Sequence, residues 1–425
     1  MNKLDQHIRL ANQKAIEKLL SVRPQLISVG SALSALGLKN YTILHAGPPF
    51  KDVEKLPKTI ESSIVLSALY EGWASNEQEA LKLLHQGLIE LKPAQDFRCV
   101  TPLAAMITPK TTLLCVNDAN SDLPACFAPL SSGPGPDIRF GTNNPEVLSS
   151  LTLRDTLIFS AMKATLNTPL DLFHFASLGL QGGDELHSST AAATQALGLE
   201  IHDRLTQTQF AHDQIHIVQE LIKSNPGFFL TPWMAACKLM LSSIEGIPYC
   251  SFITRIGGNG ECMGLSISHD PTLWHKQTAT PPIGMRFGHV HQTVEVEGVV
   301  GDSCVIDAMG FGGQITSASP QVLLTLQEHL PKDYALRAAH IMSTDHDYFS
   351  SCMSRSNAEH EARTAPKVRC GLDLLKIIQG KCYPLVNIAM LAHDGTHGLL
   401  GRGLYELDPL LCDQAAKQLP THSSI

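Results

Sequence analysis

The stretch "NPGFFLTPWMAACKLMLSSI", residues 225–244, constrains the fold most, because it has the pattern of a helix that is apolar nearly all round. Such a helix is buried in a protein core or spans a membrane. Its most apolar part, from Phe228 to Ile244, contains Pro232 and Lys238 and is short for a bilayer span. The sequence therefore predicts a buried helix and no membrane segment.

The patterns around this helix mix helices with strands. Residues 1–36, 59–73, 153–166 and 191–223 have helical periodicity, and Ser75 with Gln78 resembles a helix start. Residues 41–50 and 249–268 have strand character, the second with a hairpin connection at Gly257–Gly260. The predicted fold class is α+β, with mixed sheets and a smaller helical domain.

The length of 425 residues exceeds what one hydrophobic core usually supports. We expect three parts: an N-terminal α/β domain over 1–150, a mainly helical domain over 151–245, and a C-terminal α+β domain over 246–425. No internal repeat or low-complexity linker marks the boundaries.

Charge and cysteine content exclude several classes of protein. The net charge is -8 and there is no long run of Lys or Arg, so we expect no nucleic-acid partner. The N-terminus has an amphipathic pattern instead of a signal peptide, and the 11 cysteines contain no CxxC pair. Reduced thiols in a cytoplasmic protein fit this usage, and a structural role is expected for Cys250 and Cys262.

Two glycine-flanked motifs carry acidic residues. In "QGGDELH", Asp184 could cap the following helix, or Asp184 or Glu185 could act as a base in a cleft beside His187. In "GDSCVIDAMGFGGQ", Gly310, Gly312 and Gly313 could bring backbone N–H groups to an anion, or could simply form a turn. The spacing of the glycines in the second motif does not match a dinucleotide or nucleoside triphosphate motif.

Other candidates are isolated polar groups near glycines. His45 and Glu71 each stand beside a turn glycine, where a structural hydrogen bond and a ligand contact are equally expected. His393 and His397 are four residues apart, but a metal site would need a third ligand. A metal-dependent hydrolase using these two histidines is therefore an alternative, and we assign no metal ligands. The sequence identifies no cofactor.

Several stretches taken together resemble the AllG-like family, whose members include a subunit of oxamate carbamoyltransferase. They are "LHAGPP", "YEGWA", "GGDELH", "NPGFFLTPWMAACK", "GDSCVIDAMGFGG" and "PLVNIAMLAHDGTHGLLGRG", in this order over nearly the whole chain. The resemblance implies a cytoplasmic subunit of a multi-subunit enzyme in purine-derived nitrogen metabolism. The implied reaction exchanges a carbamoyl group between phosphate and oxamate, with carbamoyl phosphate as the donor.

The resemblance also carries over a set of candidate site residues. They are His45, Glu71, Asp184, Glu185, Arg255, Asp302, Ser303, Gly312, Gly313, Asn387 and His393. From the chemistry we expect Arg255 and the Gly312 turn to bind an anion, and Glu185 or His393 to handle a proton, with Asp184 beside them.

This chain departs from the family pattern at several positions. Ser188–Thr190 follow the acidic motif where relatives have Asn and Arg, Asp137 stands where Lys is expected, and Asp307 replaces a Glu. Another small carbamoyl acceptor is therefore an alternative to oxamate. A non-catalytic scaffolding or ligand-binding subunit, which orders the active site of a partner, is the alternative from a different class.

Overall fold

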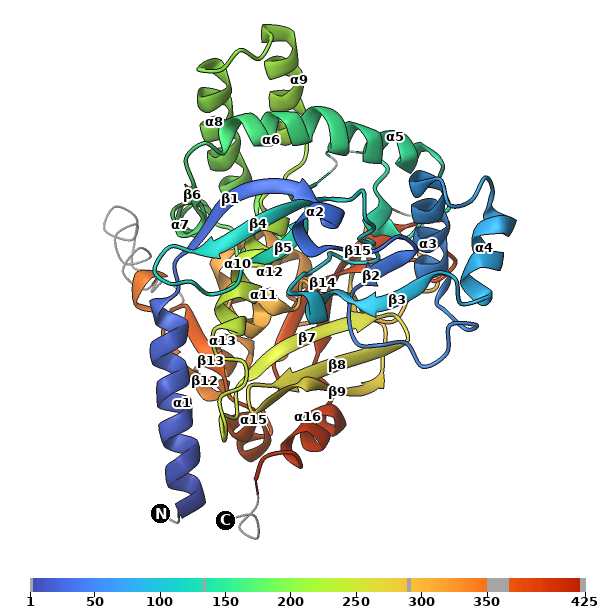
Figure 1. Cartoon of the computed structure of the whole chain (residues 1–425). Coiled ribbons are helices and arrows are strands. Elements are labelled where there is room, and N and C mark those ends of the chain that lie inside the picture. The colour runs from blue at the N-terminus through green and yellow to red at the C-terminus, as the bar shows by residue number, and fades with distance from the viewer. Residues whose placement is uncertain (1–2, 132, 134, 289–291, 350–366, 421–425) are drawn as a thin grey trace.

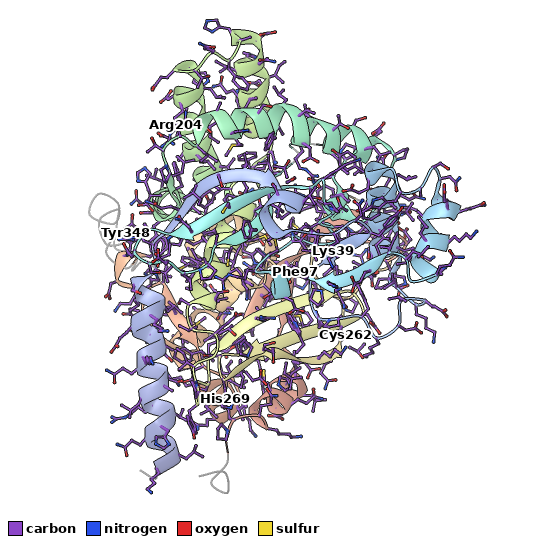
Figure 2. All side chains as sticks on the ribbon, in the orientation of Figure 1. Lys39, Phe97, Arg204, Cys262, His269 and Tyr348 are labelled. Carbon is purple, nitrogen blue, oxygen red and sulfur yellow. The ribbon has the colours of Figure 1, made fainter. Side chains whose placement is uncertain are left out.

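The computed structural model describes residues 3–131, 133, 135–288, 292–349 and 367–420. Several small sheets pack with helices in an α+β arrangement (Figure 1), which confirms the predicted fold class. Side chains fill the space between the ribbons (Figure 2).

Helix α10 (Leu230–Ser242) lies at the centre of the molecule, as its apolar sequence predicts. All residues from Thr231 to Ser242 are buried. Pro232 lies in the first turn of α10, where backbone N–H groups have no acceptor within the helix. Its missing N–H therefore costs no helix hydrogen bond. The fully buried Lys238 forms an ion pair with Glu245 at 2.7 Å, which compensates its charge.

An antiparallel sheet with the order β5-β4-β1-β6 packs on α10. Its strands are Cys126–Pro129, Thr112–Asp118, Pro24–Ser31 and Leu170–Asp171. The chain reaches this sheet through α1 (Lys3–Ser21) and leaves β1 through the short α2 (Ala32–Leu36). The expected continuous helix over 1–36 is therefore wrong in its middle, because Pro24 starts a strand that pairs with both β4 and β6.

The parallel strands β2 (Thr42–His45) and β3 (Glu90–Pro93) are joined through α3 (Lys58–Glu71) and α4 (Glu77–His85). The predicted strand before His45 and both helices are confirmed. The start of α4 is one residue later than predicted, because the Asn76 side chain accepts from Glu79 N–H at 2.9 Å. The Glu79 carboxylate in turn accepts at 2.7 Å from the N–H of Ser75, the residue before the cap.

The middle of the chain is mainly helical. Besides the strands already given, its helical elements are η1 (Ala94–Phe97), η2 (Ile138–Phe140), α5 (Glu146–Leu153), η3 (Arg154–Ile158), α6 (Phe159–Thr165), α7 (Leu172–Gln181), α8 (Ala191–Thr206) and α9 (His212–Lys223). The predicted helical region 191–223 consists of α8 and α9, which project together at one end of the molecule (Figure 1).

The described residues of the C-terminal part form three sheets. The strands are β7 (Ile253–Asn259), β8 (Cys262–Ile267), β9 (Asp270–Thr278), β10 (Ile283–Arg286), β11 (Val300–Gly301), β12 (Met342–Asp345), β13 (Arg369–Leu372), β14 (Leu385–Leu391) and β15 (Leu399–Glu406). They pair in the orders β11-β7-β8-β9, β10-β15-β14 and β12-β13. The predicted hairpin is confirmed as the β7–β8 connection.

Helices complete the C-terminal part. They are α11 (Val305–Ala308), η4 (Gly312–Ala318), α12 (Pro320–Leu326), α13 (Tyr334–Ile341), α15 (Leu374–Gly380) and α16 (Pro409–Ala416). One hydrophobic cluster includes Leu26, Trp233 and Leu391, from all three expected parts of the chain. The domain boundaries near residues 150 and 245 stay a prediction. Helix α10, from the middle part, packs against strands of the first part and against β7 and α11 of the third.

The described cysteines are free thiols, and nine of the ten are buried. Cys250 and Cys262 both belong to this buried set; Cys262 is labelled on β8 in Figure 2. Burial raises the pKa of both thiols, which disfavours the reactive thiolate.

In the described part of the chain, no helix has the length and apolar character that crossing a bilayer requires.

The central position of α10 can be tested with two matched leucines. Leu239 in α10 is fully buried, whereas Leu199 in α8 is 55% exposed. We expect Leu239→Ala to lower the free energy of unfolding by about 2–5 kcal/mol, because it leaves a cavity. Leu199→Ala should lower it by about 0.5 kcal/mol or less. Urea denaturation of both variants measures the difference, and equal losses would contradict the central packing of α10.

Candidate functional site

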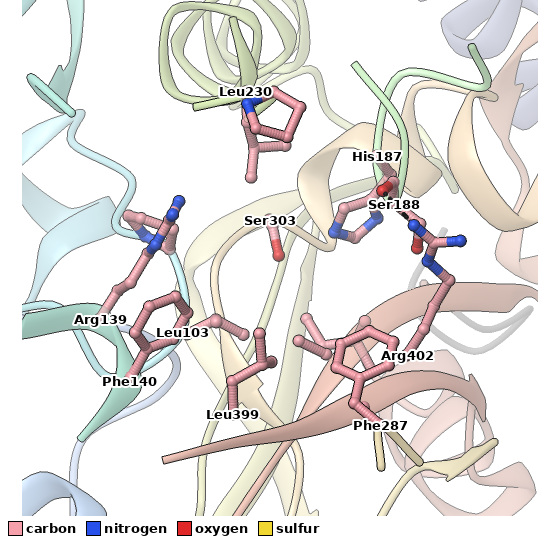
Figure 3. Close-up of a pocket in the computed structure, with 15 residues that line it drawn as sticks. Leu103, Arg139, Phe140, His187, Ser188, Leu230, Phe287, Ser303, Leu399 and Arg402 are labelled. Carbon is pink, nitrogen blue, oxygen red and sulfur yellow. Dashed lines mark hydrogen bonds between the residues drawn. The ribbon is translucent and has the colours of Figure 1, made fainter. Parts of the chain in front are cut away.

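A pocket of about 250 Å³ opens where three parts of the chain meet (Figure 3). Its lining residues are Pro102, Leu103, Arg139, Phe140, His187, Ser188, Pro226, Leu230, Phe287, Ser303, Ile388, Ala389, Leu399, Gly401 and Arg402. The start of α10 closes one side through Leu230, and β14 and β15 supply another wall.

The ionisable groups of this lining are all basic. Arg139, His187 and Arg402 line the pocket, and none of the described residues that line it is Asp or Glu. This contrasts with the net charge of -8 on the whole chain. A small, partly enclosed space with two guanidinium groups favours anions, because arginine presents several fixed donors to carboxylate or phosphate oxygens.

Arg402 in β15 donates to the Ser188 carbonyl oxygen and to Thr325 Oγ1, both at 3.3 Å. These two acceptors are uncharged. Burial lowers the pKa of Arg402, and the negative charge of Glu185 offsets this effect in part. The guanidinium charge is thus only weakly compensated by its hydrogen-bond partners.

Arg139 lies in the short turn η2, on the opposite side of the pocket from Arg402 (Figure 3). Its Nε is 3.5 Å from an oxygen of Asp137, and its guanidinium carbon is 4.9 Å from the centre of the Phe140 ring. Asp137 also begins this turn by accepting from Arg139 N–H at 3.2 Å. Arg139 is therefore held beside one carboxylate and over an aromatic ring.

His187 forms a buried pair with Asp307, with 2.7 Å between Nδ1 and the carboxylate. Burial alone would lower the pKa of His187, but the Asp307 carboxylate and the charge of Glu185 together outweigh burial, so the pKa is raised above its usual value. The other carboxylate oxygen accepts from Gly313 N–H at 2.7 Å and Asn387 N–H at 3.1 Å. Because Nδ1 is engaged by Asp307, we infer that Nε2 is the ring nitrogen available to a ligand in the pocket.

Glu185 lies behind the pocket wall and is fully buried. Its carboxylate accepts from the N–H groups of His187 at 3.0 Å and Ser189 at 3.2 Å, from Ser188 N–H, and from the Asn387 side chain at 3.1 Å. Burial raises the pKa of Glu185, although the His187 backbone bond and the other contacts oppose this. Glu185 thus fixes the loop that carries His187 and Ser188.

Asp184 caps helix α8. Its two oxygens accept from Ser189 Oγ at 2.8 Å and from Ala193 N–H at 2.9 Å. Of the two roles that the sequence leaves open for Asp184, the capping contacts are the ones present in the structure. Asp184 does not line the pocket.

Gly312 and Gly313 pack against the pair of His187 and Asp307. The Gly312 N–H donates to the Glu185 carbonyl oxygen at 2.8 Å, and the Gly313 N–H donates to Asp307. Both N–H groups are thus engaged within the protein. Gly312 has a φ of +56°, and a Cβ there would lie 2.4 Å from Asp307 Oδ1, so only glycine fits without displacing the carboxylate.

Asp302 is a buried carboxylate that joins three segments beside the pocket. It accepts from Gly47 N–H at 2.9 Å, Gln95 Nε2 at 2.7 Å and Thr101 N–H at 3.2 Å. Burial raises the pKa of Asp302 to about 7 against the effect of these hydrogen bonds. The following residue, Ser303, lines the pocket, and its hydroxyl lies between Arg139 and His187 in Figure 3.

Two further candidates lie away from the pocket lining. His45 is buried against Phe50, its Nδ1 lies 2.8 Å from the Ala46 carbonyl oxygen, and burial lowers its pKa to about 4. Glu71, at the end of α3, accepts from Lys110 N–H at 2.7 Å. Both residues therefore make the structural contacts that the sequence leaves open for them.

The structure places Arg255 and His393 outside the pocket lining as well. Arg255 forms ion pairs with Glu245 at 3.1 Å and Asp96 at 2.5 Å, so its charge is compensated by two carboxylates. His393 lies 3.2 Å from Glu297, and His397 pairs with Asp394 at 2.5 Å. The two histidines thus meet different carboxylates, and the described residues contain no group of three or more potential metal ligands.

The structure therefore brings together one part of the predicted set. Ser303 lines the pocket, and Glu185, Asn387, Gly312 and Gly313 support its wall. Arg139 and Arg402 line the pocket but are not among the site residues predicted from the sequence. Each is an isolated basic residue in a glycine-containing stretch, "SSGPGPDIRFG" and "GLLGRG", which is the one signal that could have selected them.

The fold and the pocket define an α+β protein with a small, basic pocket between its central helix and a C-terminal sheet. A family model described as "Oxamate carbamoyltransferase subunit AllG" matches residues 89–303, about half of the chain. The chain belongs to this AllG family.

Two relatives and one solved structure extend the comparison. "Oxamate carbamoyltransferase subunit AllG" of Escherichia coli (strain K12) is 26% identical, covering 96% of each chain. "Uncharacterized protein YahG" of the same organism is 26% identical, covering 96% of this chain and 85% of that protein. A conserved protein of unknown function from Enterococcus faecalis V583 has the same fold, with a TM-score of 0.90, 23% identity and 99% coverage of both chains.

Replacing Asp307 with Asn tests the electrostatic pair. Without the carboxylate, burial dominates, so we expect the pKa of His187 to fall from above its usual value of about 6.5 to below it. NMR titration of the His187 ring signals, assigned with a His187→Gln variant, measures this shift. Asp394→Asn, which removes a carboxylate that contacts His397 instead, is the control.

The same pair gives a stability change with a defined sign. Because the folded-state pKa of His187 is raised, the pair stabilises the fold fully below the unfolded-state pKa. This contribution is lost as the pH rises through the folded-state pKa.

The NMR titration also has an outcome that contradicts the electrostatic pair. If the pKa of His187 is unchanged in Asp307→Asn, Asp307 does not set the protonation of this ring.

Gly312→Ala tests whether the glycine protects this pair. The control is Gly72→Ala, because Gly72 also has a positive φ of +78° but no atom within 4 Å of an added Cβ. We expect Gly72→Ala to cost about 1 kcal/mol from backbone strain alone. Gly312→Ala should cost about 1–3 kcal/mol more, because the new Cβ displaces Asp307. Equal losses in urea denaturation would contradict the close packing at Gly312.

Proposed function

We propose that this chain is a carbamoyltransferase subunit whose basic pocket binds the reacting anions. The observation that carries this proposal is the lining itself, with Arg139, His187 and Arg402 and without a carboxylate. Carbamoyl phosphate and oxamate are both small anions, and a pocket of about 250 Å³ matches small ligands. The Escherichia coli relative, an oxamate carbamoyltransferase subunit by its name, supports the same reaction class for this chain.

In the proposed reaction the amide nitrogen of the acceptor attacks the carbamoyl carbon of carbamoyl phosphate. The new C–N bond forms as the C–O bond to phosphate breaks, and phosphate leaves with the bonding electrons. One proton is lost from the attacking nitrogen. Fixed cationic groups near the phosphate stabilise the negative charge that develops during bond breaking.

His187 is the ionisable group best placed to manage the proton. In its protonated form it donates from Nε2 to the leaving phosphate oxygen, and it then takes the proton that the acceptor nitrogen releases. Asp307 favours the protonated form and holds the ring in place. His187 thus takes the proton-handling role that the sequence assigned to Glu185 or His393, because neither of those residues lines the pocket. Glu185 and Asn387 instead position the loop that carries His187.

We further propose that the chain acts together with other protein subunits, because its AllG relative is described as a subunit. The purified chain and the complex with its co-purifying subunits are therefore both assayed.

The test is oxamate-dependent release of phosphate from carbamoyl phosphate. We expect His187→Gln to lower turnover by about 10²–10⁴-fold, the range for loss of a general acid or base. His212→Gln, on the exposed surface of α9, should leave turnover unchanged. His393→Ala should also retain turnover.

The outcomes separate the competing functions. Full turnover in His187→Gln together with a large loss in His393→Ala would return the proton role to His393. Turnover that survives the removal of Arg139, His187 and Arg402 in separate variants would favour the scaffolding function, with the reaction in a partner subunit.

A further inference from the structure

The basic pocket has two ends with different surroundings. Arg402 and His187 lie together at one side, Arg139 lies at the opposite side, and the Ser303 hydroxyl lies between them (Figure 3). The three basic groups come from β15, from the loop before α8 and from η2. Two anions could therefore bind end to end, each at its own cationic group.

The end with Arg402 offers a ligand two basic side chains, Arg402 and His187. The two hydrogen-bond acceptors of Arg402 are uncharged and both are 3.3 Å away, and His187 presents a second group that can carry a positive charge. A phosphate monoester carries close to two negative charges near neutral pH and offers three acceptor oxygens. This end therefore suits a phosphoryl group.

The end with Arg139 offers one basic side chain. Asp137 lies 3.5 Å from its Nε and compensates part of the positive charge, while Phe140 lies under the guanidinium. A carboxylate carries one negative charge and matches the planar donor pair of a guanidinium. Leu103 and Leu399 also line the pocket and have no polar side-chain atoms. A neutral amide in place of the carboxylate would therefore find few hydrogen-bond partners there.

We propose that the Arg402 end binds the phosphoryl group of the carbamoyl donor and that Arg139 binds the carboxylate of the acceptor. This inference rests on the proposed function and assigns the orientation of its two substrates. Ser303 then lies beside the carbamoyl group as it passes from one to the other. Arg139 is a specificity-determining residue, since it selects acceptors that carry a carboxylate next to the reacting amide.

The volume of the pocket is that of a small-ligand site. At about 30 Å³ for each water molecule, about 250 Å³ corresponds to roughly eight waters.

The experiment compares oxamate with oxamide, which replaces the carboxylate with a neutral amide, in the complex with its co-purifying subunits. We expect the wild-type kcat/KM for oxamate to exceed that for oxamide by at least about tenfold. Arg139→Gln should raise the KM for oxamate by at least about tenfold and reduce the discrimination to about twofold. Its KM for carbamoyl phosphate should change by less than about threefold.

Arg402→Gln should give the converse result, with a raised KM for carbamoyl phosphate and preserved discrimination between oxamate and oxamide. Arg402→Lys and Arg139→Lys, which keep the charge, should recover part of each effect and provide folded comparisons if a Gln variant is unstable. Arg9→Gln, on the exposed face of α1, is the matched control. Thermal unfolding of each variant checks the fold.

The assignment is overturned if both arginine variants change both KM values alike, or if oxamide reacts as well as oxamate. Calorimetric titration with inorganic phosphate and oxamate separates this inference from the proposed function. The two-ended pocket stands, even when no carbamoyl transfer occurs, if phosphate and oxamate bind at the same time. Phosphate binding should then be lost only in Arg402→Gln, and oxamate binding only in Arg139→Gln. Mutually exclusive binding, or binding of neither anion, contradicts it.

Discussion

The burial of α10 on all sides is the constraint on which the rest of the structure depends. An apolar helix without a polar face must be covered by other elements, and β1, β4, β5, β7, α7 and α11 supply that cover. These elements come from distant parts of the sequence, so the helix brings them together. Its first residue, Leu230, also closes one side of the pocket. The core and the candidate site are therefore built on the same helix.

Buried carboxylates provide a second level of organisation around this core. Asp302 joins the segments at Gly47, Gln95 and Thr101. Asp307 holds His187 and also accepts from the backbone of residues 313 and 387. Hydrogen bonds to charged groups contribute about 1.5–3 kcal/mol each, so these carboxylates fix the geometry of loops that have little regular structure. Acidic residues in glycine-flanked motifs thus position the pocket, while basic residues line it.

The electrostatic character of the pocket follows from this division. The carboxylates of Glu185 and Asp307 direct their oxygens to backbone N–H groups and to His187, behind the pocket wall. Arg139 and Arg402 present their guanidinium groups to the open space in front of it. A chain with a net charge of -8 can in this way offer a locally positive site, because local field depends on where charges point and how deeply they are buried.

The sequence by itself determined the α+β class, the buried helix and the β7–β8 hairpin, because hydrophobic periodicity and turn residues act over short distances. It also selected Glu185 through its glycine-flanked motif, and Ser303 and Asn387 through the resemblance to the AllG-like family. It could not show that Glu185 lies behind the pocket or that Arg255 is paired with Glu245 and Asp96. Only the tertiary structure brought Arg139 and Arg402, 263 positions apart, to one cavity. Their meeting depends on how the sheets and η2 pack around α10, and no local pattern along the chain records that packing.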